Sequence, residues 1–126
     1  MENVTVKVEM NLIITAEDID DIMVAALEGG ITYWCRKVDV EGKFLGEYAS
    51  DQISRGSLLK IYEGENSHVL DKEKLINGIL QYIKEPVASD FLEQVDHELR
   101  IDTCYVDAEV ADAIIQYALF GEVVYG

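Results

Sequence analysis

Hydrophobic and polar residues alternate at the start of the chain. Val4, Val6 and Val8 occupy every second position, with polar side chains between them. This two-residue period is typical of a half-buried β-strand, which we expect at about residues 4–10. Residues 12–14 continue the β-like composition.

Apolar residues then recur at helical spacing in the first of three expected helices. This helix should begin after Thr15, because threonine is a good N-cap residue and acidic residues follow it in the first turn. It should run over about residues 16–28 and stop at Gly29-Gly30.

A second helix is expected between Asp71, which can cap its start, and Pro86, which ends it. Gly78 lies inside this helix, where glycine costs about 1 kcal/mol relative to alanine. We interpret this glycine as a point where a neighbouring element approaches the helix closely.

The last helix should begin after Asp107 and end at Gly121. Its apolar residues cover much more of the circumference than a single core-facing stripe. Such a helix lies either at the centre of a monomeric core or between two subunits. We favour a homodimer with this helix at or near the interface, because symmetric pairs dominate soluble oligomers.

β-Branched and aromatic residues favour further strands between the helices. On the first of these strands, Trp34 and Arg36 fall on the same face and could form a ligand platform, although core packing of the tryptophan is the alternative. The polar stretches at residues 44–56 and 88–98 should be loops or short helical turns. The additional strands are expected at about residues 31–40, 58–63, 68–70 and 99–106.

These elements predict an α+β fold with a small, mainly antiparallel β-sheet packed against two or three helices. A chain of 126 residues suits one domain, and we expect a single, oligomeric domain over residues 1–126. With one proline and no serine- or glycine-rich linker, nothing marks a domain boundary.

The charge of the chain argues against binding to nucleic-acid polymers. The formal net charge is −15, from 25 acidic and 10 basic residues, whereas affinity for phosphate backbones needs clustered lysine and arginine. Mimicry of DNA is an alternative use of this acidity. Because the carboxylates are scattered through apolar segments, solubility is the favoured interpretation.

Two cysteines and the absence of a secretory signal predict a cytoplasmic protein with reduced thiols. Both Cys35 and Cys104 adjoin an aromatic residue, which favours small buried hydrophobic side chains over nucleophiles. No apolar run approaches the ~20 residues that span a bilayer, so we expect no membrane association.

Residues that carry catalysis are scarce. His68 and His97 do not form a zinc-binding spacing with the two cysteines. Asp96-His97-Glu98 is best read as a solvated charged turn, because neighbouring side chains point in different directions. No phosphate-binding loop or nucleophile elbow occurs. We therefore expect no catalytic residues, no metal site and no cofactor.

Two segments carry a family resemblance: Glu28 to Trp34 (EGGITYW) and Asp107 to Gly126 (DAEVADAIIQYALFGEVVYG). Together they resemble small bacteriophage and prophage proteins, most closely the phage Thoeris anti-defence family one. Members of that family are sponges, which bind and sequester cyclic ADP-ribose-type immune signals without destroying them.

The resemblance implies an anti-defence protein that acts in the host cytoplasm. It implies glycocyclic ADP-ribose as the first ligand, held by a homodimer or a larger homo-oligomer. Some relatives also hold cyclic oligonucleotides at separate sites created by higher assembly. The resembling segments do not identify the ligand contacts, so these must be sought from the residues themselves.

A site for such a ligand needs a flat face for adenine, positive groups for the pyrophosphate and polar partners for the ribose hydroxyls. Arg100, Asp102 and Thr103 form the leading cluster, because they precede the N-terminus of the last helix, which favours anions. Phe91 is the candidate stacking ring. Their structural alternatives are a surface ion pair of Arg100 with Glu98 and a buried position for Phe91.

Arg36 and Arg55 are the other two arginines of the chain and complete the set of candidate ligand residues. Arg55 lies in a glycine-flanked loop from which it could reach phosphate. Two rival functions stay open at this point. One is a protein-interaction module or inhibitor that docks an acidic surface on a host protein, and the other is a nucleotide-cleaving enzyme.

Overall fold

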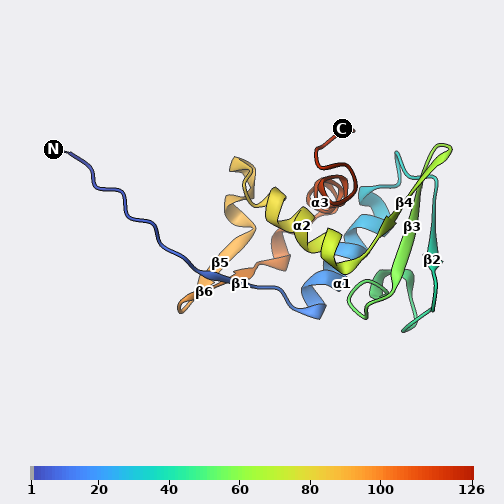
Figure 1. The fold of residues 1–126 in the computed structure, drawn as a ribbon, viewed down its shortest axis with the longest axis horizontal. Coiled ribbons are helices and arrows are strands. Elements are labelled where there is room, and N and C mark those ends of the chain that lie inside the picture. The colour runs from blue at the N-terminus through green and yellow to red at the C-terminus, as the bar shows by residue number, and fades with distance from the viewer. Residues whose placement is uncertain (1) are drawn as a thin grey trace.

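Three α-helices lie between two small β-sheets at opposite ends of the molecule (Figure 1). The computed structural model describes residues 2–126, and within them the chain forms one α+β domain. One sheet is mixed, with the strand order β1-β6-β5, and the other is antiparallel, with the order β2-β3-β4. The α-helices and strands are β1 (Asn11–Ile13), α1 (Ala16–Ala25), β2 (Lys37–Glu41), β3 (Leu58–Glu63), β4 (Asn66–Leu70), α2 (Lys72–Tyr82), β5 (Leu92–Val95), β6 (Glu98–Ile101) and α3 (Ala108–Phe120).

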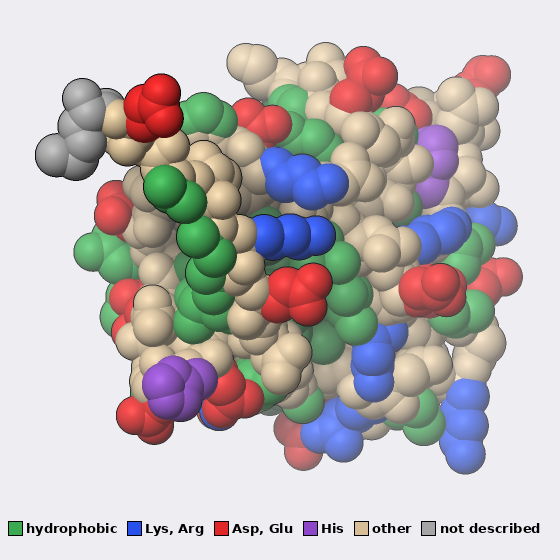
Figure 2. Space-filling model, turned by 60° about the vertical axis from the view of Figure 1, so that its left-hand side comes forward, with side chains coloured by type: hydrophobic (Ala, Val, Ile, Leu, Met, Phe, Trp, Pro, Cys, Tyr) green, Lys and Arg blue, Asp and Glu red, His purple; other side chains and the backbone are tan. Residues whose placement is uncertain are grey.

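The strand expected at residues 4–10 is absent, and this prediction is wrong for the single chain. Residues 2–10 instead form an extended arm that projects from the body and has no regular secondary structure (Figure 1). Val4, Val6 and Val8 are 86%, 73% and 76% exposed. Figure 2, which turns the arm side of the molecule toward the viewer, shows hydrophobic side chains uncovered on this surface.

The strand expected at residues 31–40 is shorter than its composition suggested. Residues 31–36 form turns, in which the backbone N–H of Cys35 donates to the carbonyl of Ile31 at 2.8 Å, and β2 begins only at Lys37. Trp34 and Arg36 therefore do not share the face of a strand. The tryptophan is 8% exposed and belongs to the core.

The β5–β6 hairpin corrects two further expectations. β5 lies in the stretch predicted to be irregular or helical, and β6 ends at Ile101 instead of extending to residue 106. Asp96 adopts a positive φ of 57° in the turn between the two strands, a conformation that aspartate tolerates better than most residues. A short 3₁₀ turn, Thr103–Tyr105, then leads into α3.

The predicted starts of the three helices are confirmed. The side chains of Thr15, Asp71 and Asp107 each accept a hydrogen bond from a backbone N–H three residues later, at 2.8–3.0 Å. Gly121 ends α3 in the left-handed conformation. α1 ends earlier than predicted, at Ala25, because a π-helical turn continues the chain to residue 30.

α3 occupies the centre of the core, enclosed by α1, α2, the π-helical turn and β4. The C-terminal residues fold back over it: Gln116 accepts hydrogen bonds from the backbone N–H groups of Val124 and Tyr125 at 2.7 and 2.8 Å. The Tyr125 ring stacks on Trp34 with centroids 5.5 Å apart. Within one chain α3 buries Ala111, Ile114 and Ile115, whereas Tyr117, Leu119 and Phe120 stay half-buried. The homodimer expected at this helix stays a prediction.

Among residues 2–126, no helix has both the length and the apolar character that crossing a membrane requires.

Candidate functional site

A surface groove runs beside the C-terminal end of α1. It consists of two adjoining hollows of about 250 and 390 Å³ that share Leu27 and Ala49, and we call it the Leu27 groove. One end carries positive side chains and the other carries an aromatic ring with hydroxyl and carboxylate groups. Its lining residues are Val24, Leu27, Glu28, Ile31, Thr32, Cys35, Arg36, Lys37, Val38, Tyr48, Ala49 and Ser50.

The π-helical turn after α1 shapes one wall of the groove. This turn, Ala26–Gly30, buries Ala26 and Gly30 and leaves Glu28 exposed. A Cβ added at Gly30 would lie 2.6 Å from the carbonyl oxygen of Ala108, closer than real Cβ contacts. Glycine is therefore needed at this position because the first turn of α3 packs directly against it.

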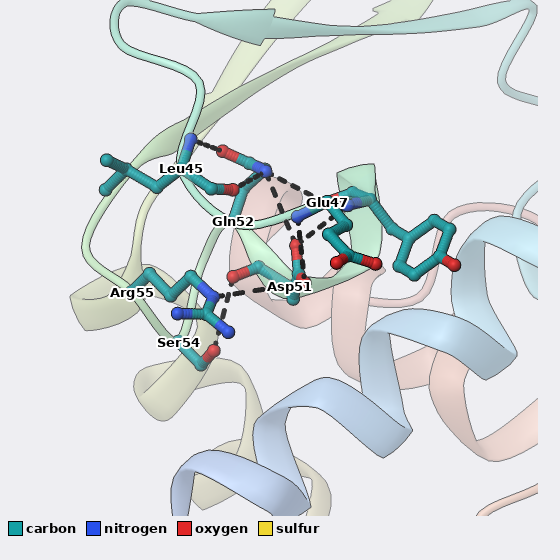
Figure 3. Close-up of polar contacts among 7 residues, drawn as sticks. Leu45, Glu47, Asp51, Gln52, Ser54 and Arg55 are labelled. Atoms are coloured by element: carbon teal, nitrogen blue, oxygen red, sulfur yellow. Dashed lines mark hydrogen bonds and ion pairs between the residues drawn. The ribbon is translucent and has the colours of Figure 1, made fainter.

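The loop between β2 and β3 forms the opposite wall and is held by two side chains (Figure 3). Gln52, which is fully buried, accepts a hydrogen bond from the N–H of Leu45 at 2.8 Å and donates to the carbonyls of Leu45 and Tyr48. Asp51 accepts from the N–H groups of Glu47 and Tyr48 at 3.4 and 3.1 Å. These contacts give a polar segment a defined shape without a strand or a long helix.

This loop places Tyr48 at one end of the groove. Its backbone is fixed by Asp51 and Gln52, whereas the residue is 66% exposed. Ser50 lies beside it, and Glu28 lines the same hollow from the π-helical turn. An exposed ring offers a face for stacking against a planar ligand, and because the backbone is already held, binding would order only the side chain.

Positive side chains gather around Tyr62 on β3. The guanidinium carbon of Arg36 lies 4.8 Å from the ring centroid, and the Nζ atoms of Lys37 and Lys60 lie 5.3 and 5.5 Å from it. The Nε of Arg36 also donates to the carbonyl of Gly64 at 2.7 Å. Three of the ten basic side chains of this acidic protein therefore lie close to the Tyr62 ring. Two of these residues, Arg36 and Lys37, also line the groove.

The three arginines differ in how their charge is compensated. Arg55 lies 3.9 Å from a carboxylate oxygen of Asp51, and Arg100 lies 3.6 Å from one of Glu98. Within residues 2–126, Arg36 has no carboxylate within 4.0 Å. Arg36 is therefore the arginine whose charge is most available to a bound anion.

The cluster predicted around Arg100 is brought together only in part. Arg100 and Asp102 lie two residues apart at the end of β6, but Glu93 is paired opposite Arg100 on β5, and Glu98 forms the ion pair that the sequence offered as an alternative. Asp102 caps the following 3₁₀ turn by accepting from the N–H of Cys104 at 3.1 Å. Acidic neighbours therefore surround this arginine.

Phe91 and Thr103, the other members of the predicted cluster, occupy different environments. Phe91 is 2% exposed and packs edge-on against Tyr82, with centroids 5.2 Å apart. Its ring offers no free face in this structure, as the core alternative anticipated. Thr103 begins the 3₁₀ turn and is partly exposed.

A buried carboxylate organises the opposite side of the π-helical turn. Asp112 on α3 accepts hydrogen bonds from the Tyr33 hydroxyl at 2.6 Å, the Trp34 indole at 2.7 Å and the Gln116 amide at 2.9 Å. Burial and the hydrogen bond to Asp112 together raise the pKa of Tyr33 to about 12. These side chains bond one another and the C-terminal backbone, so this network holds the scaffold together.

Sequence reasoning missed Tyr48, Glu28, Thr32 and Lys37 as candidate ligand contacts. A signal was present for Tyr48, because it is an aromatic residue in a polar, glycine-containing stretch where a core position is not expected. Glu28 and Thr32 flank the two glycines and were interpreted only as part of a helix end and a strand.

Within the residues that the structure describes, no group of three or more histidine, cysteine or carboxylate side chains is arranged to hold a metal ion. Comparisons with protein-family models, with curated proteins and with solved structures found no match to this chain.

Proposed function

We propose that this protein binds and sequesters a cyclic ADP-ribose-type nucleotide signal without cleaving it, and that the ligand occupies the Leu27 groove. The observation that carries the site assignment is that one groove holds both the exposed Tyr48 ring and Arg36, which has no carboxylate within 4.0 Å among residues 2–126. The resemblance of the Glu28–Trp34 and Asp107–Gly126 segments to the sponge family supplies the class of ligand.

Each part of the groove suits one part of such a ligand. The Tyr48 ring provides a face on which adenine can stack, and base–aromatic stacking contributes about 1–3 kcal/mol per base. Arg36 provides charge for the pyrophosphate, and Lys37, which is paired with Asp39 at 3.2 Å, lies beside it. Glu28 and Ser50 provide acceptors and a hydroxyl for ribose. The apolar side chains of Leu27 and its neighbours lie between these ends.

The size of the groove agrees with a ligand that spans both hollows. The hollow beside Arg36 measures about 250 Å³, below the roughly 300–1,000 Å³ of ordinary small-molecule sites, and the hollow beside Tyr48 measures about 390 Å³. A nucleotide that occupies both places its base and its phosphates at opposite ends of the groove.

Sequestration is tested by recovering the ligand after denaturation. Purified protein is incubated with glycocyclic ADP-ribose, the solution is filtered, and the free ligand is quantified before and after heating. We expect stoichiometric depletion before heating and intact ligand afterwards. Recovery of a cleavage product would instead indicate an enzyme, and no depletion at any protein concentration would contradict sequestration and favour a docking module.

The site is tested by comparing Arg36→Ala with Arg100→Ala in the same capture assay and by calorimetry. Loss of one charge-assisted contact should weaken binding by Arg36→Ala roughly 10- to 100-fold, because such contacts contribute about 1.5–3 kcal/mol. Arg100→Ala should retain capture, since Glu98 already compensates that charge. The reverse result would move the site to the end of β6.

Tyr48 offers a matched pair of variants for the other end of the groove. Tyr48→Ala should weaken binding by roughly 5- to 100-fold because the stacking face is lost, whereas Tyr48→Phe should bind like the parent. Equal affinity of all three proteins would remove Tyr48 from the site. A thermal melt of each variant checks that the fold is unchanged.

A further inference from the structure

The N-terminal arm has the sequence of a β-strand but no strand partner among residues 2–126. Its valines occupy every second position and are largely exposed, while β1, which follows directly, is paired in parallel with β6. The register of that pairing explains the missing partner. Asn11 lies opposite Glu98, so residues before Asn11 would lie opposite the Asp96-His97 turn, where β6 has not yet begun.

The arm can complete its pairing on a free edge of the same sheet in another copy. β1 is the edge strand of the β1-β6-β5 sheet, so one side of its backbone is not paired within the described residues. Such unpaired edges are templates for strand addition. If the arm of one copy paired antiparallel with the arm and β1 of a second copy, the two mixed sheets would join into one continuous sheet.

We propose that two copies of this chain dimerise through their N-terminal arms, which pair antiparallel about a two-fold axis at Val8. This inference is independent of the proposed ligand. In this register Val6 lies opposite Met10, and Val4 lies opposite Leu12. From residue 4 to residue 12, every residue on that face is apolar, and it is the face on which Leu12 already packs against the core.

Charge selects this register over its neighbours. About the axis at Val8, Lys7 of each copy lies opposite Glu9 of the other, which gives two attractive pairs. An axis at Lys7 or at Glu9 would place like charges directly opposite each other. An axis at Val6 would leave β1 outside the pairing, whereas the axis at Val8 extends the ladder through β1. The arm is thus self-complementary, as a two-fold interface requires.

A charge-exchange series tests this register. The molar mass of the parent protein in solution, followed by sedimentation over a range of concentrations, should be that of a dimer. Lys7→Glu and Glu9→Lys should each raise the dimer Kd roughly tenfold or more, because each places like charges opposite each other twice. The double variant should recover the parent Kd. An equimolar mixture of the two single variants should form heterodimers, in which both charge pairs are attractive.

Lys72→Glu provides the matched control, because it makes the same charge change at an exposed position on α2. It should leave the dimer Kd within about twofold of the parent value. A monomeric parent protein, or a dimer that neither arm variant weakens, would overturn the proposal. So would a double variant that dissociates as readily as the single variants.

A cysteine placed at the axis gives a second test. In a background with the exposed Cys104 replaced by serine, Val8→Cys should form a disulfide-linked dimer under mild oxidation, because the two side chains face each other across the axis. Val4→Cys should cross-link much more slowly, since its opposite residue is Leu12. Equal cross-linking at both positions would contradict the register.

Discussion

Asp112 is a buried residue on which side chains from distant parts of the chain converge. Its carboxylate receives hydrogen bonds from Tyr33 and Trp34, which lie nearly eighty positions earlier in the chain, and from Gln116 one turn later on α3. A buried carboxylate is costly unless it is satisfied by hydrogen bonds, and these three donors meet that requirement. Tyr33 and Trp34 therefore belong to the scaffold, although they lie in a segment that resembles the sponge family.

The Tyr33 hydroxyl predicts how stability responds to alkaline pH. Its pKa is raised from the ordinary 10.0 to about 12 in the folded protein, so the folded state retains a proton that the unfolded state has already released. The resulting stability is complete below the unfolded pKa and is lost as the pH rises through about 12. We expect the melting temperature of the parent protein to fall more steeply across this interval than that of Tyr33→Phe. Parallel curves would show that this hydroxyl does not contribute.

At the scale of elements, the close packing of α2 against α3 depends on Gly78. A Cβ added at Gly78 would lie 2.5 Å from the carbonyl oxygen of Ile114 and 2.9 Å from the Cβ of Ala118, so the two helix backbones are in direct contact there. This confirms the close approach expected from a glycine inside a helix. This contact helps to place α3 at the centre of the fold. α3 in turn packs against the π-helical turn that forms one wall of the Leu27 groove.

Gly78→Ala should therefore destabilise the fold even though alanine favours helix by about 1 kcal/mol. The added methyl group meets backbone atoms that cannot rotate away, and we expect a net loss of about 1–3 kcal/mol in the free energy of unfolding. Asn77→Ala, at an exposed neighbouring position, makes a comparable gain in propensity without a clash and should be neutral or slightly stabilising. Chemical denaturation of both variants measures the difference, and equal stability would contradict the close contact.

At the scale of the whole molecule, excess negative charge opposes compactness. The net charge is −15, yet basic residues are concentrated around Tyr62. This distribution combines a repulsive overall field with a local positive region beside the groove. A negatively charged nucleotide must overcome the repulsive overall field to reach the local positive region. Moderate salt screens this repulsion and should strengthen binding, whereas high salt also screens the contacts in the site and should weaken it.

The same repulsion predicts that salt stabilises the fold. Raising sodium chloride from about 0.01 to about 0.5 M shortens the screening length from about 30 Å to a few ångströms and should raise the melting temperature. Glu65→Lys, at an exposed turn position, reduces the net negative charge by two. This variant should melt higher than the parent at low salt and respond less to added salt. A parent melting temperature independent of salt would contradict the argument.

Much of the element-level structure could be predicted from the sequence. Thr15, Asp71 and Asp107 mark helix starts because an N-cap bonds to a backbone group three residues away, and Gly121 marks a helix end for a similarly local reason. The candidate site could be predicted less well. Arg36 was identified, but its relation to Tyr48 was not, because the two approach the same groove only after the β2–β3 loop folds over α1.

Sequence alone determined the α+β class, the three helices with their caps and the acidic character of the surface, because periodicity, capping and composition depend on near neighbours along the chain. Tertiary structure decided which segments found partners. The valines of the arm have a strand pattern, yet within residues 2–126 they stay unpaired because the turn at Asp96 ends the adjacent strand. Pairing register and the meeting of distant side chains in a groove depend on contacts between elements, which no local pattern encodes.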